Sequence, residues 1–162
     1  MSDNEILYHE HLKSPTTTAL FLGLTGIFSL LWFWRRRLDD FWSRLFAIFG
    51  GMFLFYALNY RTLEISLTRQ VFNLRFGIFA WRLPLENIAA IELDVLHPIQ
   101  RYGGAGIHGM LVGGRYRAFF NFLEYPRLVL RFKRPVGPVQ DLSFSTHQPE
   151  ALLRLVNDLI QA

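Results

Sequence analysis

The chain lacks several features that accompany common protein functions. It contains no cysteine, which excludes a disulfide framework and any metal site built on thiolates. No Gly-Lys-Ser/Thr ending follows its glycine-rich stretch, so a phosphate-binding P-loop is excluded. No serine lies in the sharp-turn motif of a hydrolase nucleophile, and the arginines are scattered rather than gathered on one basic helix. We therefore expect neither an enzyme nor a nucleic-acid-binding protein.

Charge is also missing from a long apolar segment near the N-terminus. Residues 16–34 carry no charged side chain, and at about 1.5 Å per residue they are long enough to cross the roughly 30 Å hydrocarbon core of a bilayer. A secretory signal peptide would have a shorter apolar region, followed by a small-residue cleavage site rather than by a basic triplet at Arg35. We therefore predict a first transmembrane helix over about residues 16–35.

A second apolar segment follows after a short polar turn. Residues 45–60 place apolar side chains on every face of a helix, whereas a surface helix of a soluble protein keeps one polar face. We predict a second span over about 41–60, so that residues 16–60 form a transmembrane hairpin. Two adjacent glycines, Gly50 and Gly51, would allow close packing of another helix. The expected membrane-interface anchors are aromatic and arginine side chains: Trp32, Trp34, Arg35, Arg36, Arg37, Trp42 and Arg44.

Charge does not set the orientation of this hairpin. Positive residues near the membrane are equally numerous at the turn and on the side of the two chain ends, so the positive-inside rule gives a tie. The formal net charge of +4 arises after residue 60, because positive and negative side chains balance before that point. A mildly basic domain beside a membrane would be attracted to anionic lipid headgroups.

The residue pattern changes from helical to alternating after residue 60. We expect a polar N-terminal tail at 1–15 and a β domain at 61–162, which ends in an amphipathic helix over about 148–161 with leucines at helical spacing. Short apolar-polar alternation with turns between favours an antiparallel sheet or small barrel over a parallel βαβ layout. The predicted strands lie in five segments: 63–67, 72–76, 88–95, 125–134 and 142–146.

Several motifs in this order resemble one known family. Residues 81–88, Trp-Arg-Leu-Pro-Leu-Glu-Asn-Ile, are similar to an Ile-Pro-Leu-x-x-Ile element, and residues 104–107 are similar to a Gly-x-Gly-Ile stretch. Residues 145–160 look like a closing strand and capping helix. With the two apolar segments, these motifs resemble the bacterial pleckstrin-homology-like (PH) domain membrane proteins with two N-terminal transmembrane helices. The chain departs from that pattern at His108, where an arginine is usual, and in the long glycine-rich segment 109–117.

This resemblance implies an α+β membrane protein. Its transmembrane helical hairpin would be followed by a PH-like antiparallel β-sandwich or partly open barrel of seven strands, closed at one end by the C-terminal α-helix. The resemblance also implies an integral protein of the bacterial inner membrane with both termini in the cytoplasm.

A glycine-rich stretch at 100–117 is the main candidate for a binding loop. Its backbone amides and flanking guanidinium groups could hold a phosphate or carboxylate. The alternative, which we favour, is a pair of strands joined by the hairpin signal Gly113-Gly114. The glycines are Gly103, Gly104, Gly106, Gly109, Gly113 and Gly114. The candidate contacts for an anion or a lipid headgroup are Arg75, Arg82, Arg101, Arg115 and Arg117.

Two histidines in the N-terminal tail are the only suggestion of a metal site. His9 and His11 could bind a metal together, but the tail shows no third ligand nearby and is expected to be flexible. We therefore predict no metal and no cofactor.

Two function hypotheses follow from different classes. The first is a non-enzymatic membrane-anchored interaction module, an accessory or assembly subunit whose partners are the lipid bilayer and other membrane protein subunits. The alternative is a PH-like domain that binds or senses anionic lipid headgroups. We favour the first, because a two-span anchor makes headgroup affinity unnecessary for membrane localisation.

Overall fold

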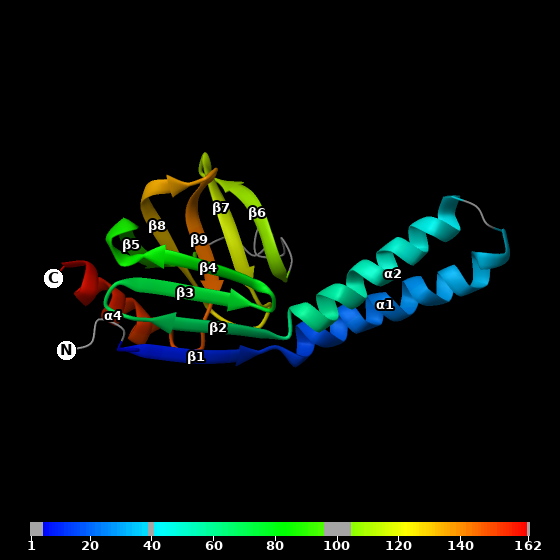
Figure 1. Cartoon of the computed structure of the whole chain (residues 1–162), viewed down its shortest axis with the longest axis horizontal. Helices are drawn as coiled ribbons and strands as arrows, with labels where there is room; N and C mark the ends of the chain where they lie inside the picture. Colours follow the sequence, from blue (N-terminus) through cyan, green and yellow to red (C-terminus); the bar gives the residue numbers. More distant parts are fainter. Residues whose placement is uncertain (1–4, 39–40, 96–104, 162) are drawn as a thin grey trace.

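The computed structural model describes residues 5–38, 41–95 and 105–161. It is an α+β protein in which a helical hairpin projects from one end of a β-rich domain (Figure 1). Both chain termini lie at the opposite end of that domain, away from the hairpin (Figure 1).

The hairpin consists of α1 (Pro15–Arg35) and α2 (Phe41–Asn59), with a short 3₁₀ turn at Arg36–Leu38. Ser14 caps α1, because its hydroxyl accepts a hydrogen bond of 3.0 Å from the amide of Thr17. Aromatic side chains hold the helices together, and the rings of Phe28 and Phe53 lie 5.4 Å apart. The two helices agree with the predicted segments to within one residue.

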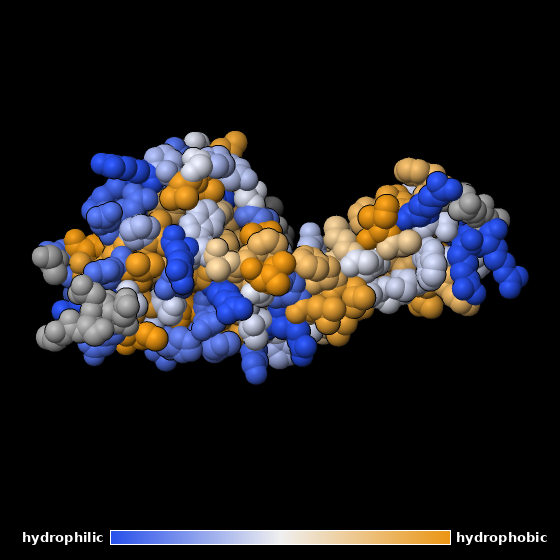
Figure 2. Space-filling view, viewed as in Figure 1, coloured by the Kyte–Doolittle hydropathy of each residue, from blue (hydrophilic) through white to orange (hydrophobic). Residues whose placement is uncertain are grey.

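The remaining surface of the hairpin is apolar and exposed. Both helices are long and apolar enough to cross a membrane. Only 11% of the most apolar stretch of α1, and 17% of that of α2, is buried inside the protein. Trp34 is 80% exposed, and Leu30 and Phe41 are each 71% exposed. Figure 2 shows this surface as mostly orange and pale orange, interrupted by white and pale-blue residues, with hydrophilic residues at the tip. A core helix of a soluble domain would be covered instead.

Two β-sheets form the domain, with nine strands among the described residues. The first sheet has the order β1-β2-β3-β4 and is antiparallel throughout: β1 Tyr8–Lys13, β2 Thr62–Leu67, β3 Val71–Phe76 and β4 Phe79–Pro84. The second sheet has the order β5-β8-β9-β7-β6: β5 Ile88–Leu93, β8 Arg127–Val136, β9 Val139–Ser145, β7 Arg115–Asn121 and β6 Gly106–Val112. A 3₁₀ turn at Leu85–Asn87 connects the sheets.

The core lies between the two sheets and under the C-terminal helix. Phe72 of β3 lies 5.2 Å from Phe144 of β9, measured between ring centroids. Helix α4 (Pro149–Gln161) buries Leu152 and Val156 completely and packs mainly on β5. This helix confirms the predicted segment 148–161, and its apolar stripe covers the end of the sandwich, as amphipathic spacing requires.

The segment that was expected to be a flexible polar tail is instead an edge strand. β1 pairs with β2 over six residues, with His11 opposite Glu64. The buried Glu10 hides the strand pattern in the sequence. Its carboxylate accepts hydrogen bonds from the Tyr8 hydroxyl at 2.7 Å, the Thr146 hydroxyl at 2.6 Å and the His147 amide at 2.6 Å. A charge is tolerated inside when donors of this kind satisfy it.

The five predicted strands are all present, but the expected seven-stranded antiparallel sheet is wrong in two respects. The described residues form nine strands, and β7 and β9 run parallel. The favoured alternative for the glycine-rich stretch is confirmed in its described part, because β6 and β7 form a hairpin that turns at Gly113 and Gly114. Both glycines have positive φ angles of 57° and 79°, which this turn requires.

Candidate functional site

The four predicted anion contacts that the structure describes do not converge on one place. Arg115 lies at the start of β7 and makes a two-pronged ion pair with Asp141 of β9, with nitrogen–oxygen distances of 2.8 and 3.0 Å. The Asp141 side chain is 1% exposed. The Arg115 side chain is 39% exposed, but its guanidinium group is paired with this buried carboxylate.

Arg117 is buried in the same network. Its Nη1 atom lies 3.2 Å from Asp94, and its Nη2 atom lies 3.6 Å from Asp141. Ser143 donates a hydrogen bond of 2.7 Å to the other oxygen of Asp94. Two arginines of β7 therefore balance Asp141 of β9 and Asp94, the residue after β5. The sequence gives little signal of this arrangement, because the partners lie far apart along the chain.

Two other candidate arginines lie on the outer face of the four-stranded sheet. Arg75 of β3 is opposite Glu64 in the strand register, and Arg82 of β4 is opposite Asn73. The Arg75 Nε atom also donates to the carbonyl of Gly77 at 3.4 Å. This face therefore keeps the two guanidinium groups in contact with solvent, beside a carboxylate. Arg101, Gly103 and Gly104 lie outside the described residues.

The remaining glycines of the binding-loop candidate have structural explanations. Gly106 has a φ angle of 95° and lies against the ring of Tyr60. A side chain at Gly109 would collide with the hydroxyl of Tyr116 on the neighbouring strand. The positive φ angle at Gly106 favours glycine, whereas a side chain at Gly109 would require the Tyr116 side chain to move.

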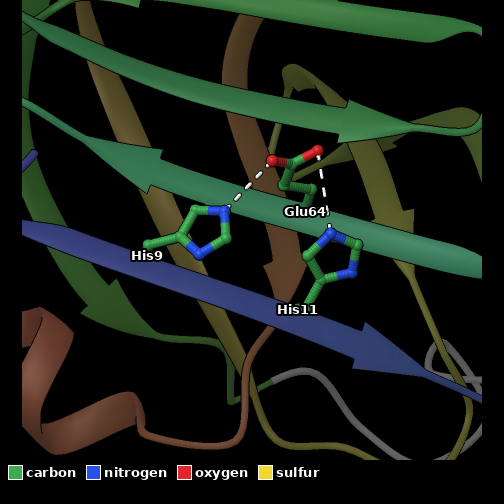
Figure 3. Close-up of side chains that lie close together, drawn as sticks. All are labelled: His9, His11 and Glu64. Atoms are coloured by element: carbon green, nitrogen blue, oxygen red, sulfur yellow. Dashed lines mark hydrogen bonds and ion pairs between the residues drawn. The ribbon is translucent and has the colours of Figure 1, made fainter.

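The outer face of the same sheet brings three potential metal ligands together (Figure 3). The Nε2 atom of His9 lies 3.1 Å from Glu64 Oε1, and the Nε2 atom of His11 lies 3.9 Å from Glu64 Oε2. The hydrogen bond from His9 is the main cause that lowers the pKa of Glu64. The expectation that His9 and His11 have no third ligand nearby is therefore wrong.

The two glycines predicted for helix packing face different surroundings. A Cβ atom at Gly50 would lie 3.5 Å from the hydroxyl of Ser29, so Gly50 faces α1 within the hairpin. A Cβ atom at Gly51 would meet nothing within 4 Å. Gly51 therefore belongs to the outward surface. At the tip, the predicted anchors Trp34 and Trp42 are exposed, and the Arg36 guanidinium lies 4.0 Å from the Phe33 ring centroid.

The junction between hairpin and β domain is tied at several points. The side chain of Asn59, the last residue of α2, accepts a hydrogen bond of 2.9 Å from the amide of Ile78 in the β3–β4 turn. The α1 cap residue, Ser14, donates to Glu124 at 2.9 Å. The Tyr125 hydroxyl donates to the carbonyl of Lys13 at 2.7 Å. These contacts join the hairpin base to both sheets and fix its direction.

Comparisons with protein-family models, curated proteins and solved structures give no match. The resemblance to PH-like membrane proteins therefore stays a prediction. The function of the chain has to be inferred from its own geometry.

His108 gives a test of the β6–β7 packing. Its ring stacks on Phe119 at 4.8 Å, and burial, helped by the positive charge of Arg127, lowers its pKa. In the unfolded chain His108 takes up a proton near the ordinary histidine pKa of about 6.5. In the folded chain it takes up that proton only at a lower pH. This contribution to stability is present above the unfolded pKa and is lost as the pH falls towards the lower folded pKa.

We therefore expect the Tm to decrease between pH 7 and pH 5, and His108→Gln to make that decrease shallower. Thermal unfolding in mild detergent at several pH values measures both slopes. His147→Gln, at an exposed histidine, is the comparison variant. Equal slopes for the His108 variant and the unmodified protein would contradict the assignment.

Proposed function

We propose that the protein is a non-enzymatic membrane-anchored interaction module, an accessory or assembly subunit of a larger membrane protein complex. The observation that carries this proposal is the way in which the hairpin is inserted between two neighbouring strands. Only Ser14 separates β1 from α1, and only Tyr60 and Arg61 separate α2 from β2.

This connection supports a function that depends on orientation. A domain that only needs to stay near a membrane can be held by a flexible linker of many residues. Here both connections are short, and β1 and β2 are paired along their whole length. The β domain would therefore be held at one orientation to the bilayer, which is what a subunit with fixed neighbours requires.

The exposed helices supply the second part of the proposal. Their apolar surface is suited to lipid and to partner helices, and Gly51 leaves room on that surface for close helix approach. In this proposal the hairpin spans the bacterial inner membrane and both termini are cytoplasmic, as the family resemblance implies. The bilayer and other membrane subunits are the partners.

Binding of anionic headgroups is the second candidate, and fewer residues support it. Arg115 and Arg117 are paired with buried carboxylates, and an ion in such a pair has little affinity left for another anion. Arg75 and Arg82 remain on the outer sheet face, where Glu64 reduces the positive potential. We therefore favour the interaction module.

Extraction from the native membrane in mild detergent tests the proposal. We expect a stoichiometric set of other membrane subunits to accompany the protein and to remain after a wash in about 1 M salt, where screening confines electrostatic attraction to roughly 3 Å. Native mass measurement gives the composition. A lone monomer or small homo-oligomer would contradict the proposal and favour the headgroup-binding alternative.

A substitution series at Gly51 sharpens this test. Gly51→Leu fills the outward space without touching α1, so we expect about a tenfold loss of co-purified subunits, equivalent to about 1.4 kcal/mol. Gly51→Ala adds one methyl group and is the matched control, with a much smaller loss. Equal recovery of the partner subunits with both variants would show that this face does not contact them.

A further inference from the structure

The outer face of the four-stranded sheet carries a side-chain cluster that the proposed function does not use. His9 and His11 alternate on β1 and so point to the same side of the sheet, as residues two apart on a strand do. Glu64 lies on β2, directly opposite His11. Figure 3 shows both imidazole rings turned towards the Glu64 carboxylate.

We propose that His9, His11 and Glu64 bind a divalent transition metal of the Zn²⁺ class. The inference is independent of any partner complex, because all three residues belong to this chain and lie outside the hairpin.

The donor atoms are close to the spacing that such an ion needs. Zinc bonds to nitrogen and oxygen measure about 2.0–2.2 Å, which puts two donors of a tetrahedral site about 3.3 Å apart. One donor atom from each residue lies within 4.8 Å of the others, and the His9–Glu64 pair is already at 3.1 Å. The distance from His11 Nε2 to Glu64 Oε2 is longer, 3.9 Å, and the His11 ring is 51% exposed, so it has room to rotate towards the ion.

The donor set selects a class of metal. Imidazole nitrogen suits Zn²⁺, Cu²⁺ and Ni²⁺, whereas Mg²⁺ and Ca²⁺ prefer ligand sets made of oxygen. Three protein ligands leave the fourth position for water. Two positive side chains face the cluster, Lys13 on β1 and Arg75 on β3, and their repulsion weakens binding of any cation.

The place of the cluster gives metal binding a structural consequence. β1 is an edge strand, and its end leads directly into α1. A metal bound by His9, His11 and Glu64 would cross-link this edge strand to β2, the strand that follows α2. Bound metal would therefore stabilise the two strands from which the hairpin emerges.

Titration of the full chain in detergent with Zn²⁺, after removal of any histidine tag, tests the site. Calorimetry should give one Zn²⁺ per chain, and Mg²⁺ should give no saturable binding. Co²⁺ should give the visible absorption bands of a tetrahedral nitrogen–oxygen site. We expect His11→Ala and Glu64→Gln each to weaken Zn²⁺ binding by at least about tenfold, whereas His147→Ala, the matched histidine control, should leave it unchanged.

A second variant separates metal binding from a general effect on folding. Arg75→Gln removes a cation beside Glu64, so it should tighten Zn²⁺ binding by about two- to fivefold. Thermal unfolding in EDTA should be the same for the His11 variant and the unmodified protein, because the ring is exposed. The proposal is overturned if the unmodified protein binds no Zn²⁺ saturably, or if the His11 and Glu64 variants bind it as tightly as the unmodified chain.

Discussion

Asp141→Asn is expected to lower the free energy of unfolding by about 3–5 kcal/mol, the usual cost of breaking a buried ion pair by removing one charge. The Asp141 side chain is 1% exposed and pairs with both Arg115 and Arg117. The substituted amide would carry no charge, and among the described residues Arg117 would keep only Asp94 as a counter-charge. Arg117 is itself 10% exposed, so water cannot replace the lost partner.

The same sheet offers a matched control on its surface. Arg131 and Glu92 form an ion pair of 2.8 Å, but their side chains are 45% and 49% exposed. Exposed pairs contribute about 0–1 kcal/mol, so Glu92→Gln should change stability by no more than that. Chemical or thermal unfolding in the same detergent measures both variants. A change of less than about 1 kcal/mol for Asp141→Asn would show that the network is solvated and not structural.

Local sequence patterns predict the fold elements that depend on near neighbours. The hairpin is encoded in two uninterrupted apolar segments, and α4 in the spacing of its leucines. The strands β2, β3, β8 and β9 have an alternating pattern that is visible without any knowledge of their partners, and β5 lies in a strand-like segment rich in apolar residues. Periodicity is a property of the segment itself, so these elements could be recognised one at a time.

Elements that depend on distant partners could not be recognised in this way. The inward residue Glu10 of β1 is polar, so this segment resembles a tail until β2 is placed beside it. The parallel pairing of β7 with β9 likewise has no local signal. Tertiary pairing, rather than propensity, decides both cases.

The candidate sites follow the same rule. His9 and His11 were visible as a pair, but the third ligand, Glu64, lies more than fifty positions later in the chain. Arg115 was visible as a basic residue at the edge of a glycine-rich stretch, but its counter-charge Asp141 belongs to a different strand. The sequence shows which residue types are available for a site. Only the pairing of the strands shows which of these residues meet, and which charges remain exposed.

Gly77→Ala tests the fixed junction between the hairpin and the β domain. Gly77 has a φ angle of 60°, and a Cβ atom there would collide with the backbone carbonyl and side chain of Asn59 at the end of α2. The left-handed conformation alone costs about 1–2 kcal/mol for alanine, and overpacking adds about 1–3 kcal/mol. Because the backbone carbonyl is in the way, rotation of the Asn59 side chain cannot relieve the collision.

Gly137→Ala is the matched control for this prediction, because Gly137 also has a φ angle of 60° but would meet nothing within 4 Å. Both variants bear the conformational cost, so the difference in unfolding free energy, about 1–3 kcal/mol, isolates the contact with Asn59.

The orientation of the hairpin can be measured directly, because a chain without cysteine accepts spin labels at introduced Arg37→Cys and Glu150→Cys sites. The distance distribution between the labels should be narrow in the parent protein and in the Gly137 variant, and broader after Gly77→Ala. An unchanged distribution would mean that this contact does not hold the hairpin, and that its direction depends on β1, β2 and the contacts of Ser14 and Lys13.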